Sequence, residues 1–233
     1  SMTTEKLFNF QISHVQNLAE CVLTEQCVLD ASSTGTGKTY CALKVCEHVG
    51  LKPFIICPKA VITNWITVSK YLNVPILGVA NYEKAKVGKY YNEKLQIIES
   101  KFIKESDEPV STHDINKHKF ILKFPVNTII IFDEAHRCKN WKTSNFGLML
   151  SVKDADLKMM LLSATISDKI ECFRTFGFIF NLFHHTKKAY KTWLCTTARN
   201  LGLSMTEDTK KLYEPFLIHT TLFPRLGSRM DIK

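Results

Sequence analysis

The sequence predicts an α/β fold in which a mostly parallel β-sheet carries helices on both of its faces. Short apolar runs alternate along the chain with longer segments whose apolar residues repeat at helical spacing. Each apolar run ends on polar residues, and a glycine-containing turn follows the first run. The carboxyl ends of parallel strands meet at one edge of a sheet, where such folds bind their ligands. We therefore expect the functional residues along that edge.

Composition limits the class of protein. The chain has 233 residues, of which 45% are hydrophobic and 23% are charged, as is usual for globular domains. No apolar run approaches a transmembrane helix and the N-terminal residues lack a signal-peptide pattern, so no membrane partner is expected. The eight cysteines are scattered without a Cys-x-x-Cys pair. This usage predicts reduced thiols in an intracellular, reducing compartment, either nucleus or cytoplasm, and no structural zinc.

The net charge has two interpretations. A formal value of +9 suits a polyanionic partner such as a nucleic acid. The positive charge is spread widely along the chain, however, and a lysine-rich solvated surface explains it equally well. Charge alone leaves both interpretations open.

The first expected element is an amphipathic helix within residues 7–26. Its apolar face is formed by residues at helical spacing, namely Val15, Leu18, Ala19, Val22 and Leu23. Phe10 and Gln11 open the segment, which places Gln11 near the position of an adenine if the following turn binds a nucleotide. A surface glutamine without a ligand is the alternative interpretation of Gln11.

The second element, over residues 28–49, is a strand, a turn and a helix around which the chain is organised. Val28 and Leu29 end a buried strand, and apolar residues repeat at helical spacing from Lys38 onward. The turn between them, Ser33–Thr39, contains two glycines that let backbone amides approach a ligand. Amides and the dipole of a helix N-terminus attract anionic oxygens, so the segment predicts a phosphate-binding loop.

The residues of this loop have predicted roles. Lys38 would reach the β- and γ-phosphates of a nucleotide, and the hydroxyl of Thr39 would ligate Mg²⁺. The predicted nucleotide-binding set is Gln11, Thr34, Gly35, Thr36, Gly37, Lys38 and Thr39. The usual pattern has a glycine at the position that Ser32 occupies here.

Two more strands are expected at residues 53–57 and 76–79, with a helix containing Trp65 between them. Their carboxyl ends carry Pro58, Lys59, Asn81 and Tyr82. Beyond Tyr82 we expect helical material to about residue 103. Residues of about 104–119 are polar and without periodicity, which predicts an exposed insertion with solvated histidines.

Val126–Phe132 is the most β-prone segment and delivers Asp133, Glu134, Ala135 and His136 at its carboxyl end. Facing a phosphate loop, Asp133 would hold Mg²⁺ and Glu134 would polarise an attacking water. A further buried strand, Lys158–Leu162, ends at a tripeptide that can link the nucleotide site to a ligand of the sheet edge, Ser163, Ala164 and Thr165.

The tail, residues of about 167–218, predicts a helical extension rich in phenylalanine. Those rings are expected to fill a core, and a surface for a neighbouring domain is the alternative. Residues 222–233 have no obvious partner element and are expected to begin a linker. The predicted organisation is therefore one domain over residues 1–221 followed by this linker.

Taken in order, these segments resemble motifs Q, I, Ia, Ib, II and III of superfamily 2 helicases and translocases. Within that superfamily the Snf2-like group is the nearest match. Pro58–Trp65 is similar to its P-x-x-x-x-x-N-W signature, and Asp133–Asn140 is similar to its D-E-A-H-R-x-K-N signature. Ile166–Phe173 and Tyr213–Ile218 resemble the segments that follow motif III and precede the second lobe.

The resemblance implies a fold, cofactors and partners. It implies the first RecA-like lobe, a three-layer sandwich, of an ATP hydrolase that uses ATP and Mg²⁺. The partners it implies are a second RecA-like lobe, which supplies an arginine finger, and nucleic acid, with DNA favoured over RNA. The implied catalytic residues are Lys38, Asp133 and Glu134, the implied coupling residues are His136 and Ser163–Thr165, and the implied nucleic-acid contacts are Pro58, Lys59, Asn81 and Tyr82.

Two departures from the Snf2-like pattern leave alternatives open. Ser163–Thr165 replaces the usual T-G-T, and His219-Thr220 stands where arginines often follow P-F-x-L. An RNA helicase with the same lobe is therefore one alternative. A non-hydrolysing module that binds a nucleotide or a protein partner is another.

Overall fold

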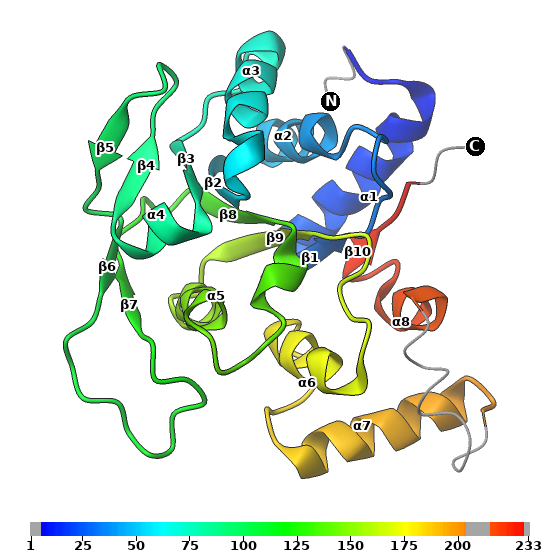
Figure 1. Ribbon diagram of the computed structural model, residues 1–233. Helices are drawn as coiled ribbons and strands as arrows, with labels where there is room; N and C mark the ends of the chain where they lie inside the picture. The colour runs from blue at the N-terminus through cyan, green and yellow to red at the C-terminus, as the bar shows by residue number, and fades with distance from the viewer. Residues whose placement is uncertain (1–5, 204–214, 231–233) are drawn as a thin grey trace.

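A computed structural model describes residues 6–203 and 215–230. An eight-stranded sheet forms its centre (Figure 1). In sheet order the strands are β10 (Gly227–Ser228), β1 (Cys27–Asp30), β9 (Lys158–Leu162), β8 (Thr128–Asp133), β2 (Lys52–Cys57), β3 (Gly78–Asn81), β4 (Lys89–Tyr91) and β5 (Ile97–Glu99). The strands from β10 to β3 pair in parallel, and β4 and β5 continue the sheet antiparallel.

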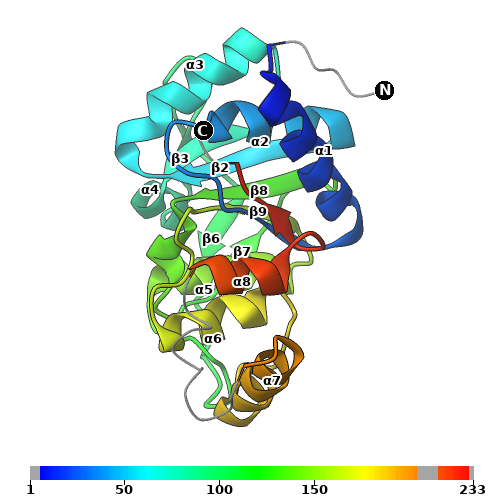
Figure 2. The same cartoon turned by 90° about the vertical axis from the view of Figure 1, so that its right-hand side faces the viewer.

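Helices cover both faces of the sheet, which gives three layers (Figures 1 and 2). One face carries α1 (Asn9–Thr24), α2 (Lys38–Val49) and α3 (Ile62–Leu72). The other carries α5 (Ser144–Asp154), α6 (Ile170–Ile179) and α8 (Pro215–Leu222), with α7 (Lys187–Asn200) outside α6. The fold is therefore the predicted RecA-like three-layer sandwich. No helix within the described ranges combines the length and the apolarity needed to cross a bilayer.

Smaller elements complete the chain. They are two 3₁₀ turns, η1 (Lys59–Val61) and η2 (Ala135–Cys138), the short helix α4 (Tyr82–Lys86), and a separate antiparallel pair, β6 (Ile103–Glu105) and β7 (Phe120–Leu122). Residues 106–119 connect β6 to β7 and are anchored by Asn116, whose buried amide donates to the carbonyls of Trp141 and Thr143.

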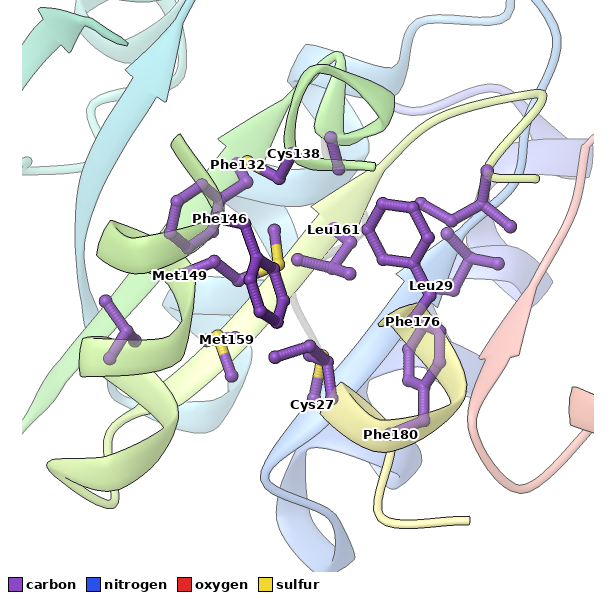
Figure 3. Packing of buried hydrophobic residues seen from close by; sticks show 14 of the residues in the cluster. Cys27, Leu29, Phe132, Cys138, Phe146, Met149, Met159, Leu161, Phe176 and Phe180 are labelled. Carbon is purple, nitrogen blue, oxygen red and sulfur yellow. The ribbon is translucent and has the colours of Figure 1, made fainter. Parts of the chain in front are cut away.

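The core is divided in two because successive strand residues point to opposite faces of the sheet. Leu29 and Phe132 lie on the side of α5, α6 and α8, whereas Val28 and Ile131 lie on the side of α1, α2 and α3. Figure 3 shows the first cluster, where α5 and α6 close on the strands through Phe146, Phe176 and Phe180. The prediction that phenylalanines of the tail fill a core is confirmed for three buried rings, Phe173, Phe176 and Phe180.

The prediction of helical material from Tyr82 to about residue 103 is wrong. Helix α4 ends at Lys86, and the chain then forms β4, β5 and β6. The hairpin between β4 and β5 turns at Asn92, whose side-chain oxygen accepts the amides of Lys94 and Gln96. Tyr90 of β4 packs edge-on against Phe54, so tertiary contacts outweigh the helix-compatible local sequence.

The expectation that residues after 222 lack a partner element is also wrong. Gly227 and Ser228 pair in parallel with Leu29 and Asp30, and Leu226 is buried. A Cβ atom at position 227 would lie 2.2 Å from the carbonyl oxygen of Leu29, so the close approach of this strand requires glycine. Tyr213 and Glu214, part of the segment compared with P-F-x-L, lie outside the described residues.

Candidate functional site

The sheet order brings the predicted nucleotide-binding segments together. The phosphate loop follows β1, Ser163–Thr165 follow β9, and Asp133 ends β8, and these three strands are neighbours in the order β1-β9-β8. The segments with predicted nucleic-acid contacts follow β2 and β3, the next strands of the same sheet. All of them lie at the shared carboxyl edge, as parallel pairing requires.

The phosphate loop is stabilised from within and from α1. The Thr36 hydroxyl donates to the carbonyl of Ser33 at 2.7 Å, and Gln11 Nε2 donates to the carbonyl of Thr36 at 2.9 Å. Gly37 precedes α2 with φ of 83°, a conformation that favours glycine. Thr34 and Gly35 are exposed at the tip of the loop, where a phosphate could reach the backbone.

Gln11 is held in place rather than solvated. Its side chain is 5% exposed, and its Oε1 accepts the backbone N–H of Phe8 at 2.8 Å. The surface-glutamine interpretation of this residue is therefore wrong. The bond to Thr36 joins the start of α1 directly to the phosphate loop.

A cavity of about 330 Å³ opens beside the loop at Gln11. Four of its nine lining residues are aromatic, and the full lining consists of Lys6, Phe8, Phe10, Gln11, Gly35, Thr36, Gly37, Tyr40 and Tyr71. Phe8 and Phe10 stack with their ring centroids 5.9 Å apart, and both rings are exposed. A planar base would find apolar faces here and the amide of Gln11 at its edge. Tyr40 and Tyr71 were not among the predicted residues, because only the fold places them beside the loop.

Asp133 faces the phosphate loop. The positive charge of Lys38 lies close enough to lower the pKa of the Asp133 carboxyl. Burial acts in the opposite direction and is the larger effect, so the pKa of Asp133 is raised overall. The sequence predicted that a carboxylate would face the phosphate loop, and the half-buried Asp133 lies within the electrostatic influence of Lys38.

The residues present fit a magnesium ion. Asp133 at the end of β8 offers carboxylate oxygens and Thr39 in the first turn of α2 offers a hydroxyl oxygen, and these are ligands that Mg²⁺ prefers. Within residues 6–203 and 215–230 no three His, Cys, Asp or Glu side chains gather into a metal-binding group. Such an ion would therefore share its ligands with nucleotide phosphates and water, as Mg²⁺ usually does.

Glu134 follows in an uncommon backbone conformation, with φ of 50° and ψ of 52°. Left-handed geometry in a non-glycine residue costs free energy and often occurs at functional positions. Its Oε2 accepts from Arg137 Nε at 2.9 Å, and both side chains are about half exposed. The ion pair holds the Glu134 carboxylate at the surface of the site.

Two of the predicted coupling residues, His136 and Ser163, are in contact. His136 Nδ1 lies 3.0 Å from the hydroxyl oxygen of Ser163, whose side chain is buried. Burial lowers the pKa of His136, which favours its neutral form. The contact joins the ends of β8 and β9. Ala164 has no polar side-chain group, and no side-chain hydrogen bond of Thr165 is seen among the described residues.

The predicted nucleic-acid residues are only partly exposed. Lys59 is exposed at the start of η1, and Pro58 before it is buried. Tyr82 is 4% exposed, and its hydroxyl donates to the carbonyl of Asp133 at 2.8 Å. The ring of Tyr82 therefore supports β8, and Asn81 beside it is half-buried.

The C-terminal segment contacts the phosphate loop, which the sequence did not reveal. The Ser32 hydroxyl accepts the backbone N–H of Met230 at 2.9 Å, so the serine at the usual glycine position has a bonding partner. Buried His14 lies 2.9 Å from both Asp30 Oδ2 and the Ser228 hydroxyl oxygen. This network ties α1, β1 and β10 together behind the loop.

Comparison with known proteins decides the family. The family model described as DEAD/DEAH box helicase matches residues 13–173, more than half of the chain. The chain belongs to the DEAD/DEAH box helicase family. The matched range includes the phosphate loop, the Asp133–His136 segment and Ser163–Thr165, and it corresponds to the N-terminal RecA-like lobe of these ATP-hydrolysing enzymes.

Two relatives extend the comparison of this helicase lobe. A protein of Acanthamoeba polyphaga mimivirus, described as the putative ATP-dependent RNA helicase L364, is 39% identical over 190 residues, which are 79% of the chain and 35% of that protein. The SWI2/SNF2 ATPase core of Sulfolobus solfataricus, solved in complex with dsDNA, has a similar fold, with a TM-score of 0.58 at 18% sequence identity. The match covers 99% of the present chain and 45% of the archaeal chain. The chain thus spans about a third of the viral relative and under half of the archaeal structure, whose likeness shows the fold alone.

Proposed function

We propose that the chain is the ATP-binding lobe of an ATP-dependent Snf2-like translocase that moves on nucleic acid. The observation that carries the proposal is the placement of Lys38 after β1 and of Asp133 at the end of β8, two strands with only β9 between them, so that the charge of Lys38 acts on the Asp133 carboxyl. The phosphate loop would hold the triphosphate, and Lys38 would neutralise its β- and γ-oxygens. Bound Mg²⁺ would neutralise developing charge, with Asp133 and Thr39 among its ligands.

Two further groups act around the phosphates. The carboxylate of Glu134 would orient the attacking water and accept its proton. The contact between His136 and Ser163 would transmit the state of the nucleotide site to the ends of β2 and β3. Completion of the site would require a second RecA-like lobe with an arginine finger, because Arg137 is already paired with Glu134.

DNA is the favoured nucleic acid. The Snf2-like signatures at Pro58–Trp65 and Asp133–Asn140 support it, and the archaeal protein of similar fold is described with dsDNA. Exposed Lys59 at the carboxyl edge would contact phosphates, so binding would be salt-sensitive and largely independent of sequence. RNA is the second candidate, supported by the name of the viral relative and by the S-A-T form of Ser163–Thr165. The buried free thiols support a reducing intracellular compartment.

Nucleotide binding tests the core of the proposal. Titration of the chain with a fluorescent ATP analogue and Mg²⁺ is expected to show saturable binding. Lys38→Ala should weaken that binding about tenfold or more, because charge-assisted hydrogen bonds to phosphate are lost. Lys70→Ala, which removes an exposed lysine of α3, is the matched control and should bind as the parent does. Equal binding by both variants would refute the role of Lys38.

Stimulation of ATP hydrolysis separates the two nucleic acids. The longer protein that contains this chain would be assayed with duplex DNA, single-stranded DNA and RNA of matched length. The proposal expects the greatest stimulation by duplex DNA, whereas preferential stimulation by RNA would favour an RNA helicase. Binding of ATP without turnover under every condition would indicate the non-hydrolysing module.

A further inference from the structure

Trp65 is the last residue of the Pro58–Trp65 signature, and no role has been assigned to it so far. The residue lies on α3 and is fully buried, with an exposed fraction of 0%. Its indole Nε1 donates a hydrogen bond of 2.9 Å to Asp133 Oδ2. A buried tryptophan N–H needs a partner, and here that partner is the carboxylate at the centre of the candidate site.

Asp133 is held from both faces of the sheet. Trp65 belongs to the core on the side of α1, α2 and α3, whereas Tyr82 belongs to the core on the opposite side. The Tyr82 hydroxyl donates to the backbone carbonyl of Asp133 at 2.8 Å. One aromatic residue therefore fixes the side chain of Asp133 and the other fixes its backbone, just before the left-handed turn at Glu134.

The hydrogen bonds orient the two carboxylate oxygens. Oδ1 of Asp133 accepts the backbone N–H of Glu134 at 2.9 Å, and Oδ2 accepts the Trp65 indole. A carboxylate has about four lone-pair sites, so these two bonds leave acceptor capacity on both oxygens. The two hydrogen bonds fix the rotamer of Asp133 and leave this remaining capacity for a further ligand such as a metal ion.

We propose that Trp65 is a positioning residue that holds the Asp133 carboxylate in the orientation needed to ligate a nucleotide-bound magnesium ion. The inference rests on the proposed nucleotide site and adds a residue to it. Partners that orient a metal ligand typically change metal affinity about tenfold to a hundredfold when they are removed. Trp65 does not itself contact the ion or the nucleotide in this proposal.

The test removes one N–H group and keeps an aromatic ring. Trp65→Phe abolishes the bond to Asp133, and Trp193→Phe makes the same chemical change on α7, far along the chain from the site. Binding of a fluorescent ADP analogue would be measured first with a chelator and then across a range of Mg²⁺ concentrations. Thermal unfolding of each variant would report its folding.

The expected result separates the metal from the nucleotide. Trp65→Phe should bind the analogue without metal as the parent does, and should need about tenfold more Mg²⁺ for the metal-dependent gain in affinity. Trp193→Phe should match the parent in both measurements. Equal loss of binding with and without Mg²⁺ would indicate a purely structural role and overturn the proposal, as would an unchanged requirement for Mg²⁺ in Trp65→Phe.

Indole N–H signals provide a readout that requires no substitution at Asp133. The chain has three tryptophans, so a ¹⁵N-correlation spectrum has three indole N–H signals, and the signal lost in Trp65→Phe assigns Trp65. That signal should shift when Mg²⁺ is added to the ADP-bound protein and should shift little with ADP alone. A signal indifferent to Mg²⁺ would overturn the inference while leaving nucleotide binding intact. Absence of any nucleotide binding by the parent would overturn both this inference and the proposed function.

Discussion

At Gly37, the last residue before α2, the backbone conformation affects the candidate nucleotide site directly. Its φ is 83°, and a Cβ atom there would lie 2.5 Å from Gln11 Nε2, the group that bonds to Thr36. Gly50 at the other end of α2 has φ of 72°, but nothing lies within 4 Å of its Cβ position. The two glycines share a strained conformation and differ in their neighbours, which makes them a matched pair.

Gly37→Ala should therefore reduce nucleotide affinity, whereas Gly50→Ala should not. Both substitutions carry the left-handed penalty of about 1–2 kcal/mol in stability. Only Gly37→Ala also displaces Gln11 from the phosphate loop. Calorimetric titration with Mg²⁺ and a non-hydrolysable ATP analogue measures the difference. Affinity lost equally in both variants would show that global destabilisation, rather than the loop, is responsible.

Glu134→Gln tests the role assigned to the second acidic residue. Glutamine keeps the size of the side chain but cannot accept a proton, so hydrolysis should fall about 10²–10⁴-fold while nucleotide binding persists. The measurement is the single-turnover rate of the longer protein with saturating nucleic acid. Glu83→Gln, an exposed change on α4, serves as the control. Normal hydrolysis by Glu134→Gln would remove this residue from the mechanism.

The segments of the candidate site were largely predictable at the residue scale because their sequence patterns are local. Lys38 comes shortly after β1 and Asp133 ends β8, and parallel pairing then brings the two segments to the same edge of the sheet. Trp65 and Tyr82 escaped prediction as partners of Asp133, because their hydrogen bonds span 68 and 51 residues of sequence. No local pattern marks a contact of that kind.

At the scale of elements, buried strands were predicted well and exposed ones poorly. Lys158–Leu162 is fully apolar after its first residue and matches β9 throughout. The residues of β4 and β5 are mostly half-buried or exposed and mix lysine, tyrosine and isoleucine, so neither strand periodicity nor apolarity separates them from helix. The conformation of the segment between α6 and α7 likewise depends on packing against other elements. His185 in this segment is an example.

The ring of His185 packs edge-on against Trp141 and Phe178. Burial and the nearby charge of Arg174 lower the pKa of His185 from about 6.5 to about 4. The folded state thus favours the neutral ring, and the unfolded state binds the proton more readily. The resulting stabilisation is complete above pH 6.5 and is lost as the pH falls toward 4.

His185→Phe should reduce the dependence of stability on pH between pH 4 and 6.5, because phenylalanine keeps a ring but does not titrate. The free energy of unfolding in urea, measured at several pH values, checks this. His184→Phe changes the exposed neighbour and should leave the slope as it is in the parent. An unchanged slope in His185→Phe would mean that other groups govern stability in this range.

At the scale of the whole molecule, the two ends of the described chain meet behind the phosphate loop. His14 of α1, Asp30 of β1 and Ser228 of β10 form one buried network, although Ser228 is 214 residues from His14. Sequence alone gave no sign of it, since each residue is unremarkable in its own segment. The network makes the N-terminal helix, the first strand and the last strand one cooperative unit.

Ser228→Ala should lower the free energy of unfolding by about 1–3 kcal/mol, because His14 Nδ1 would be left buried without its partner. Ser111→Ala, at an exposed position between β6 and β7, should change stability by no more than about 0.5 kcal/mol. Urea denaturation monitored by circular dichroism compares the two variants. Equal stability of both would show that water or a shift of β10 replaces the lost bond.

The pairing of β10 with β1 has a practical consequence for recombinant work. A shorter expression product that stopped at Leu222 would leave β1 with unpaired backbone groups on its outer side. Bare strand edges recruit strands from other molecules, so such a product would be prone to aggregate. Truncation boundaries for crystallisation or assay should therefore keep the chain at least through Met230.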